Sequence, residues 1–569
     1  MADFETLVDA LDYAATGLTG YNFYDARGNL KSVLTYKDLQ ENAWTTAKRL
    51  IGLGLERGEH VAIIADTTPE FITLFFACRY AGVVPFAMPV PVNLGSHDIY
   101  VKQLRGMMSV SKASIALANK EYIDFLEEAS ADLKSIKWVG TPELLEGIQA
   151  SDKEFQKNLQ NEVAYLQFTS GSTRAPQGVI ITEKAVMSNL QGIVRDALTL
   201  GPEDRCASWL PFYHDMGLIG LVLAPMVSQM SVDFLRTRDF AVRPIQWLRL
   251  ISRNKCTIAF TPPFGLELCT LRVRSADLEG LDLSSWRAAG VGAEMISPTV
   301  LKNFANKFAS VGFNPNAFLP CYGLAEACIA VTFAEVGSGL EALKVDTELL
   351  ADQGIAACID TENKKHSEFV NCGKALPGHI VIVVDKEGNS LPDMRVGRVL
   401  LQGPSLMSGY VNDPEATKRV MKPDNRMDTG DLGFLSQGNL YLTGRHKDII
   451  IINGRNIRAQ DIEEIAEQQQ EIRTRETSAF SAVDNNGIST VVLVIENRLS
   501  LVEERQSLIS RVQRLVYNAF GIHCLVELVP PHTLPRTSSG KLSRAAACKG
   551  FLERTGFANP QSYQADSHH

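Results

Sequence analysis

The chain lacks an excess of positive charge. It contains 56 Lys and Arg residues against 65 Asp and Glu residues, which gives a net charge of −9 and a pI near 5.7. A nucleic-acid backbone would meet net repulsion, so we do not expect nucleic acid as the main partner. Residues 446–569 contain fourteen residues of each sign, so the negative excess belongs to the preceding region. A small-molecule substrate is the simpler expectation.

The ten cysteines form no Cys-x-x-Cys pair and show no regular spacing. This pattern argues against a disulfide framework and against structural zinc, and we expect reduced thiols in the core. The first ten residues lack a basic start and an apolar core, and they contain Asp3, Glu5 and Asp9. No secretory signal is therefore expected, and the chain is predicted to be cytoplasmic.

The sequence also lacks a long apolar run without breaks. The best candidate is Phe71 to Val92, which is interrupted by Arg79, by Gly82 and by prolines at 85, 89 and 91. These residues predict a buried helix followed by a short strand and a loop, so we expect no integral membrane segment. With 45% hydrophobic and 21% charged residues, the chain has the composition of a globular protein.

What is present is an alternation of strand-like and helix-like segments, which predicts an α/β fold. The first segments are strand-like 61–65, helix-like 71–80, strand-like 113–117, helix-like 123–133 and strand-like 136–139. Helix-like 183–198 and strand-like 207–210 continue the pattern. We predict a large domain over 1–444, a small α+β domain over 445–554 and a polar tail over 555–569. The boundary is placed at the charged break of residues 445–448.

The segment from Phe168 to Val179 has the composition of a phosphate-binding loop. Thr169, Ser170, Ser172 and Thr173 supply hydroxyl groups, and Gly171 allows close approach of the backbone to phosphate oxygens. The loop lies between two strand-like runs and is not a Walker A loop, because no Gly-Lys-Ser/Thr opens a helix here. An ordinary polar hairpin remains the alternative.

Six further segments complement this loop. They read Trp-Leu-Pro-Phe-Tyr-His-Asp-Met-Gly at 209–217, Val-Gly-Ala-Glu at 291–294, Tyr-Gly-Leu-Ala-Glu at 322–326, Thr-Gly-Asp at 429–431, Gly-Arg-His-Lys-Asp at 444–448 and Pro-Arg-Thr-Ser-Ser-Gly-Lys at 535–541. Over nearly the whole chain, this ordered set resembles the adenylate-forming superfamily of acyl-CoA synthetases, nonribosomal peptide adenylation domains and luciferases. The residues at 170–174, 211–218 and 322–326 resemble the corresponding motifs of fatty acyl-AMP ligases. An insertion over about 335–370 also resembles the extra segment of these ligases.

This resemblance implies a large adenylate-forming domain of several sheets with a small C-terminal lid, and it implies ATP and Mg²⁺ as cofactors. A fatty acid carboxylate would attack the α-phosphate of ATP, so the site must neutralise charge. Glu326 would hold Mg²⁺, Lys541 would contact the carboxylate and the α-phosphate region, and His214 would lie near the carboxylate. The alternatives are a solvated Glu326, an exposed Lys541 and a buried structural His214.

The resemblance also implies a nucleotide site. Asp431 would accept hydrogen bonds from the ribose, with Arg445 near the same sugar, although Asp431 is alternatively a turn residue. The adenine would be bordered by the 292–294 and 322–325 segments, with core packing as the alternative for Tyr322. The residues expected to contact the nucleotide in these two segments are Gly292, Ala293, Glu294, Tyr322, Gly323, Leu324 and Ala325. Lys447 occupies the position of the family's hinge.

Three functions remain open at this stage. If the insertion pins the lid, free CoA would be excluded and the acyl group would pass to an acyl carrier protein acting in trans, since no carrier segment follows Lys541. We therefore predict a fatty acyl-AMP ligase that acts on a medium or long fatty acid. A fatty acyl-CoA synthetase and a non-catalytic adenylate-binding scaffold are the alternatives.

Overall fold

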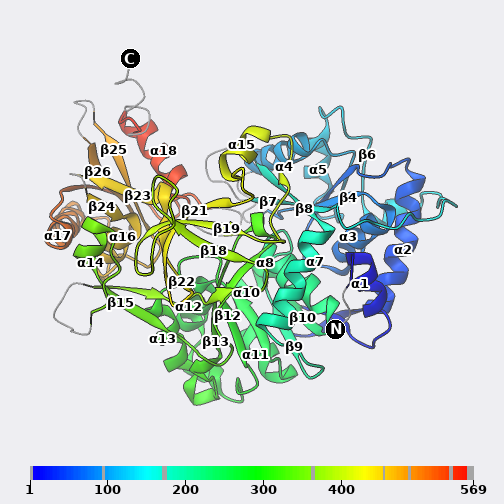
Figure 1. The fold of residues 1–569 in the computed structure, drawn as a ribbon, viewed down its shortest axis with the longest axis horizontal. Coiled ribbons are helices and arrows are strands. Elements are labelled where there is room, and N and C mark those ends of the chain that lie inside the picture. Colours follow the sequence, from blue (N-terminus) through cyan, green and yellow to red (C-terminus); the bar gives the residue numbers. More distant parts are fainter. Residues whose placement is uncertain are drawn as a thin grey trace.

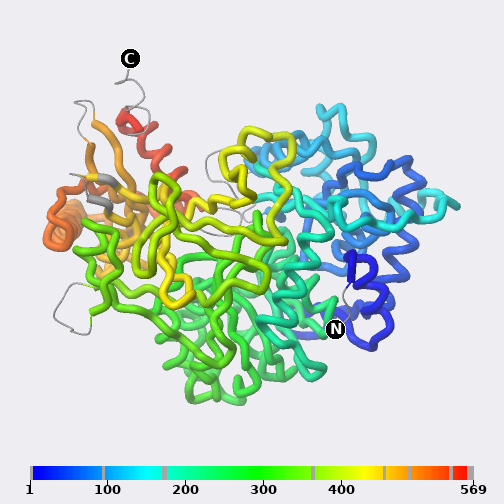
Figure 2. The backbone as a smooth tube through the Cα atoms, in the orientation of Figure 1, coloured from blue at the N-terminus to red at the C-terminus, as the bar shows by residue number. Residues whose placement is uncertain are grey.

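The computed structural model describes residues 4–91, 97–169, 176–359, 366–452, 455–484, 489–536 and 542–559. The described strands form sheets of nine, seven, four and three strands and two strand pairs. Helices cover these sheets, which confirms the predicted α/β class (Figure 1). The last part of the chain, orange and red in Figure 2, forms a lobe beside the strands of residues 374–445.

The nine-stranded sheet is parallel at its centre and antiparallel at both edges. Its order is β17 (Lys374–Ala375), β14 (Ala330–Phe333), β13 (Phe318–Gly323), β12 (Ala288–Val291), β11 (Ile258–Thr261), β9 (Arg205–Ser208), β10 (Ser231–Leu235), β1 (Gly20–Tyr24) and β2 (Leu30–Thr35). Strands β12 and β13 end at the 292–294 and 322–326 segments. Two of the predicted site segments therefore lie at neighbouring strand ends of one sheet.

The seven-stranded sheet carries the predicted phosphate-binding segment. Its order is β20 (Gly409–Tyr410), β8 (Gln177–Thr182), β7 (Val163–Thr169), β4 (Val84–Met88), β3 (His60–Ile64), β5 (Ile115–Leu117) and β6 (Trp138–Gly140). Strands β7 and β8 are antiparallel, with Thr169 opposite Gln177. The predicted strand–loop–strand arrangement is present on both sides, while Ser170, Gly171, Ser172 and Thr173 lie outside the described residues.

The four-stranded sheet carries the predicted ribose-binding pair. It is antiparallel, in the order β18 (Ile380–Val384), β19 (Gly397–Gln402), β21 (Met427–Ser436) and β22 (Asn439–Arg445). Asp431 on β21 lies directly opposite Arg445 on β22. The predicted insertion contains β15 (Ala342–Asp346), α14 (Thr347–Gln353) and β16 (His366–Val370), and its two strands pair with each other.

The chain after Arg445 builds its own hydrophobic clusters. The pair β23 (Ile449–Ile452) and β24 (Arg455–Arg458) precedes α16 (Ala459–Ala466), and a sheet of β25 (Thr477–Val483), β26 (Ser489–Glu496) and β27 (Cys524–Val529) follows. Helices α17 (Val502–Phe520) and α18 (Arg544–Thr555) pack on it. We refer to residues 449–559 as the C-terminal unit; the domain boundary at residue 444 stays a prediction.

Fourteen further helices are described in the larger part of the chain. They are α1 (Leu7–Ala14), α2 (Tyr36–Gly52), α3 (Pro69–Ala81), α4 (His97–Ser111), α5 (Ile123–Ser130), α6 (Pro142–Glu146), α7 (Glu183–Gln191), α8 (Asp215–Leu218), α9 (Ala224–Val227), α10 (Thr237–Val242), α11 (Ile245–Asn254), α12 (Pro263–Arg272), α13 (Pro298–Phe308) and α15 (Pro414–Val420). Helix α3 begins with Pro69 and ends at Gly82, which has φ 72°. Both residues suit these positions.

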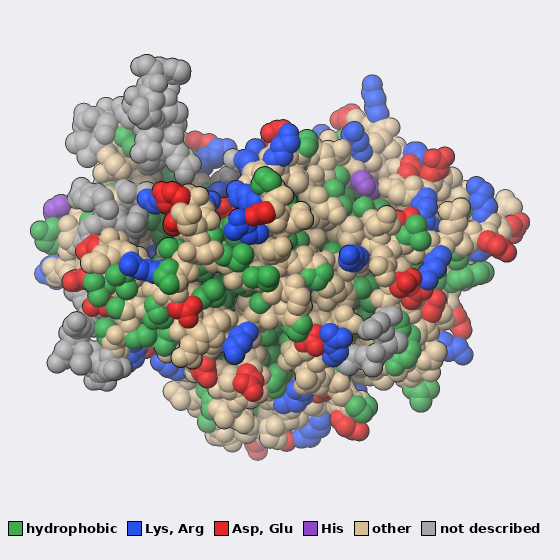
Figure 3. Space-filling view, in the orientation of Figure 1, with side chains coloured by type: hydrophobic (Ala, Val, Ile, Leu, Met, Phe, Trp, Pro, Cys, Tyr) green, Lys and Arg blue, Asp and Glu red, His purple; other side chains and the backbone are tan. Residues whose placement is uncertain are grey.

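The apolar stretch that begins at Phe71 forms most of the buried helix α3 and then β4 within the described residues, as its sequence predicted. Within the described ranges, no helix combines the length and the apolar composition needed to cross a bilayer. Acidic and basic side chains are interspersed over the face shown in Figure 3. This face therefore presents no continuous field of one sign.

Some predicted element bounds and one burial prediction are wrong. The predicted helix 123–133 ends at Ser130. The helix predicted near 183–198 is present, as an α-helix over Glu183–Gln191 that continues as a π-helix over Gly192–Ala197. All ten cysteines are free, as predicted, but Cys358 is exposed because it lies in the insertion rather than in the core. Short apolar runs define an element's existence better than its ends.

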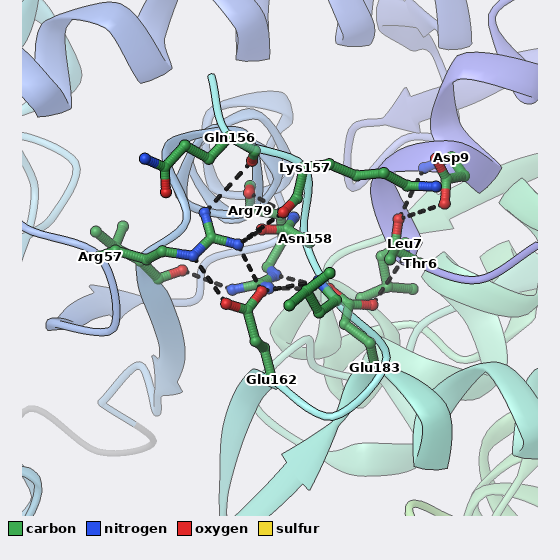
Figure 4. A network of polar contacts seen from close by, with 12 residues as sticks. Thr6, Leu7, Asp9, Arg57, Arg79, Gln156, Lys157, Asn158, Glu162 and Glu183 are labelled. Carbon is green, nitrogen blue, oxygen red and sulfur yellow. Dashed lines mark hydrogen bonds and ion pairs between the residues drawn. The ribbon is translucent and has the colours of Figure 1, made fainter. Parts of the chain in front are cut away.

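A buried ion pair joins three helices of the larger part (Figure 4). Arg79 of α3 donates from Nη2 to Glu183 Oε1 over 2.9 Å, and both side chains are almost fully buried. The second oxygen of Glu183 accepts the backbone N–H of Leu7, the first residue of α1, over 2.9 Å. Arg79 Nη1 donates to the carbonyl oxygen of Val83. Every strong polar group of the pair therefore has a partner.

Removing one partner of this pair leaves an uncompensated buried charge. We expect Arg79→Met to lower the free energy of unfolding by about 3–5 kcal/mol. Urea unfolding followed by tryptophan fluorescence measures this change. The matched control is Lys157→Met, since Lys157 pairs with Glu5 nearby but both side chains are more than half exposed. A control loss as large as that of Arg79→Met would contradict the assignment.

Candidate active site

A single large cavity collects most of the predicted site residues. Its volume is about 3620 Å³, and it lies where the ends of β7, β13 and β21 face the C-terminal unit. The predicted residues that line it are Thr169, His214, Ala293, Glu294, Tyr322, Gly323, Leu324, Ala325, Glu326, Asp431, Arg445 and Lys447. Gly292 is buried directly behind this wall. Lys541, like residues 170–173, lies outside the described residues.

The Asp431 carboxylate has a hydrogen-bond partner on each of its oxygens. The Tyr322 hydroxyl donates to Asp431 Oδ2 over 2.6 Å, and Arg445 Nε donates to Oδ1 over 3.2 Å. Asp431 is 8% exposed, and burial raises its pKa, while Arg445 and the Tyr322 hydroxyl oppose this rise. The tyrosine hydroxyl comes from β13 and the carboxylate from β21, so the bond joins two sheets at the cavity.

Glu326 points to the same cavity from the short 3₁₀ turn Ala325–Ala327, which follows β13. Its Oε1 accepts a hydrogen bond from the Tyr410 hydroxyl over 2.8 Å, and burial raises the pKa of the Glu326 carboxyl. The turn needs Gly323, because a Cβ there would lie 1.6 Å from the carbonyl oxygen of Ile329. Tyr410 had no signal in the sequence, since it lies 84 residues away.

His214 caps the start of α8. Its ring Nδ1 lies 2.6 Å from Asp215 Oδ1, and the backbone N–H of Met216 lies 3.3 Å from the same nitrogen. The side chains of His214 and Asp215 are each less than a quarter exposed. These contacts engage Nδ1, so among the described residues Nε2 is the ring nitrogen that is left for a substrate.

The 292–294 segment combines close packing with a special backbone. A Cβ on Gly292 would lie 2.9 Å from the carbonyl oxygen of Cys321, and Ala293 has φ 69°. The carboxylate of Glu294 pairs with Arg475 of the C-terminal unit, whose Nη2 lies 2.6 Å from both oxygens. Contact of Glu294 with a nucleotide stays a prediction. Arg475 had no signal in the sequence, because nothing around it resembles a motif.

Lys447 is exposed in the 3₁₀ turn His446–Asp448, which links β22 to β23. The next residue, Asp448, accepts a hydrogen bond from Arg544 Nη1 over 2.8 Å, and Arg544 also pairs with Glu463. The end of the linker is thus anchored in the C-terminal unit, while Lys447 itself stays exposed. The hinge role of Lys447 stays a prediction.

The apolar wall of the cavity comes from part of the segments considered for an acyl tunnel. Within 259–264, Phe260, Pro263 and Phe264 line the cavity. Within 218–226, Gly220 lines it, whereas the other side chains are buried in a segment that includes the π-helix Ile219–Leu223. The first segment can therefore contact an apolar ligand, and most of the second is core.

Among the described residues, no three His, Cys, Asp or Glu side chains are grouped as a metal site. A single carboxylate at Glu326 suits Mg²⁺, which commonly binds one or two protein carboxylates and takes its other ligands from water and substrate phosphates. The residues present fit this mode of binding. The ion, when bound, would neutralise phosphate charge.

Comparison with known proteins identifies the family of this chain. The profile of the family described as "AMP-binding enzyme" matches residues 22–411. A Caulobacter vibrioides protein named "Putative acyl-CoA synthetase" is 41% identical over 97% of this chain and 96% of its own length. The medium-chain-fatty-acid–[acyl-carrier-protein] ligase JamA of Moorena producens is 31% identical over 97% of this chain and 96% of its own.

Solved structures give the same result. One described under fatty acyl-adenylate ligases from E. coli and L. pneumophila is 45% identical, with a TM-score of 0.93, over 97% of this chain and 98% of that chain. The family profile covers more than half of the chain, and the relatives span nearly all of it. The chain therefore belongs to the AMP-binding enzyme family of adenylate-forming ligases.

Proposed function

We propose that this protein activates a medium or long fatty acid with ATP, giving acyl-adenylate and pyrophosphate, and passes the acyl group to an acyl carrier protein in trans. The observation that carries the proposal is the Asp431 carboxylate, held by Tyr322 and Arg445 in a cavity that Glu326 and His214 also line. One wall of this cavity is apolar. The arrangement suits a ligand with a sugar, an anionic centre and an apolar chain.

The side chains divide the chemistry among them. Asp431, oriented by the Tyr322 hydroxyl, would accept hydrogen bonds from ribose hydroxyls, since an ionised carboxylate is acceptor-only. Nε2 of His214 would hold the fatty acid carboxylate near the α-phosphate. Glu326 would bind Mg²⁺, and Lys541 would offset the charge that develops as the phosphorus becomes five-coordinate. Bringing two anions together is the main barrier that these groups lower.

Transfer to a carrier protein is supported by two observations. JamA, named as a ligase to acyl carrier protein, is similar over nearly the whole chain. In addition, Arg458 of the C-terminal unit stacks over the ring of Phe369 in the insertion, 4.5 Å from its centroid. This contact ties the insertion to the unit that is expected to rotate. The alternative is a fatty acyl-CoA synthetase, which the name of the Caulobacter relative favours.

The deciding experiment is mass spectrometry of the products. The protein is incubated with Mg²⁺, ATP and octanoate, dodecanoate or hexadecanoate, with CoA or with a phosphopantetheinylated acyl carrier protein. We expect acyl-AMP without acceptor, an acyl thioester on the carrier, and no acyl-CoA. Abundant acyl-CoA would establish the synthetase instead. Absence of acyl-AMP from every reaction would contradict both.

Tyr322→Phe tests the ribose site. Loss of a hydrogen bond to a charged group is worth about 1.5–3 kcal/mol, so we expect the KM for ATP to rise by roughly tenfold, with a smaller fall in kcat. Pyrophosphate release at varied ATP measures both. Tyr441→Phe is the matched control, because Tyr441 is a buried tyrosine on β22 that does not line the cavity. An unchanged KM for ATP in Tyr322→Phe would remove the Tyr322 hydroxyl from nucleotide binding.

Lys541→Ala tests the predicted cationic group. We expect fatty-acid-dependent pyrophosphate release to fall by about 100-fold or more, because loss of one group that stabilises transition-state charge has this effect in other enzymes. The thermal unfolding midpoint should stay unchanged. Lys418→Ala, on the exposed face of α15, serves as the control. Full activity of Lys541→Ala would exclude Lys541 from the mechanism.

A further inference from the structure

Arg475 connects the C-terminal unit to the cavity wall. It lies in the segment between α16 and β25, and its Nη2 is 2.6 Å from both carboxylate oxygens of Glu294, 181 residues earlier. Its guanidinium also stacks over the Phe264 ring, 5.1 Å from the centroid. Glu294 and Phe264 both line the cavity. One side chain of the C-terminal unit is thus clamped onto the wall that the larger part of the chain provides.

The backbone of Arg475 is fixed from its own side. Its N–H donates to Glu467 Oε1 over 2.7 Å, and its carbonyl oxygen accepts from Arg536 Nη2 over 2.8 Å. Arg475 has φ 65°, a left-handed conformation that non-glycine residues adopt infrequently and that persists only where surrounding contacts fix it. The residue therefore acts as a rigid connector and not as a flexible surface arginine.

The environment makes this ion pair stronger than an ordinary surface pair. The side chains of Arg475 and Glu294 are only 26% and 13% exposed, so solvent screens their attraction weakly. The adjacent pair Arg498–Glu476 offers a comparison within the same unit. Its atoms are 3.6 Å apart, and the Arg498 side chain is 47% exposed. Close, largely buried ion pairs such as Arg475–Glu294 can contribute measurably to association, whereas longer and more exposed pairs such as Arg498–Glu476 contribute little.

Arg475 also contacts the segment of the C-terminal unit that contains Arg536 and faces the cavity. Arg536, which bonds to its carbonyl oxygen, forms a β-bridge with Leu542, and both line the cavity. Contacts therefore run from Glu294 on the wall, through Arg475, to Arg536. Opening the Arg475–Glu294 pair would remove the contact through which Arg475 holds this segment against the wall.

We infer that the Arg475–Glu294 pair is an electrostatic latch that favours the domain arrangement in which the acyl-adenylate forms, with Arg475 as a positioning residue. The inference rests on the proposed adenylate-forming activity. A contact made in one arrangement and absent from another shifts the populations by its own interaction free energy, and 1.4 kcal/mol is a factor of ten. Loss of the latch therefore lowers the fraction of molecules that are competent for adenylation.

The first test is Arg475→Ala in the full-length protein with dodecanoate, ATP and Mg²⁺. We expect kcat for pyrophosphate release to fall by about tenfold, with the KM for ATP nearly unchanged, because fewer molecules are competent while the nucleotide contacts remain. Arg498→Ala is the matched control and should keep wild-type kcat. The thermal unfolding midpoint of each variant shows whether the fold is intact. Wild-type kcat in Arg475→Ala would overturn the latch.

The second test separates pairing from a general structural effect. In a double-mutant cycle, Arg475→Ala combined with Glu294→Ala should lose no more activity than Glu294→Ala alone, because the pair is already broken in that variant. The reversed pair, Arg475→Glu with Glu294→Arg, should recover at least threefold over Arg475→Ala. Additive losses together with no recovery would overturn the latch. Failure of the proposed function is distinguishable, because the wild-type protein itself would then release no pyrophosphate with any fatty acid.

Discussion

The cavity depends on one buried carboxylate at the junction of two sheets. Asp431 stands on β21 of the four-stranded sheet, yet one of its partners is Tyr322 on β13 of the nine-stranded sheet. A buried charge is costly unless hydrogen bonds replace its lost hydration. The carboxylate is therefore stabilised only when the two sheets keep their relative position. That position also places Glu326, three residues after Gly323, at the same opening.

Two ion pairs likewise connect separate parts of the molecule. The Arg79–Glu183 pair fixes α3, α7 and the start of α1, and the Arg475–Glu294 pair fixes the C-terminal unit on the cavity wall. The two differ in burial. The first is almost completely excluded from water and cannot open without exposing the core, whereas the second lies at a cavity and is the pair that we propose to open when the C-terminal unit moves. An ion pair of Arg and Glu thus makes a fixed contact at Arg79–Glu183 and, under the proposed latch, a reversible contact at Arg475–Glu294.

Several strands and helices could be predicted because local sequence patterns determine them. Strands β3 and β4, helix α3 and the antiparallel β7–β8 pair follow from short apolar periods and from proline and glycine positions. Each of the quoted motifs contributes described residues to the lining of one cavity. Element ends were less predictable, since the helix predicted over 123–133 ends at Ser130. Tyr410 and Arg475 were missed because their partners are 84 and 181 residues away, and only the tertiary fold brings them together.

Tyr410 connects the strand β8 to the carboxylate of Glu326. Tyr410 pairs through its backbone with Val179 of β8, the strand that follows the predicted phosphate-binding segment, while its hydroxyl bonds to Glu326. The hydrogen bond from Tyr410 lowers the pKa of the Glu326 carboxyl, whereas burial, the larger effect, raises it. A displacement of β8 would therefore move the Tyr410 hydroxyl, which is the hydrogen-bond partner of the Glu326 carboxylate. The strand on one side of the cavity and the carboxylate on the other are thus joined through a single tyrosine residue.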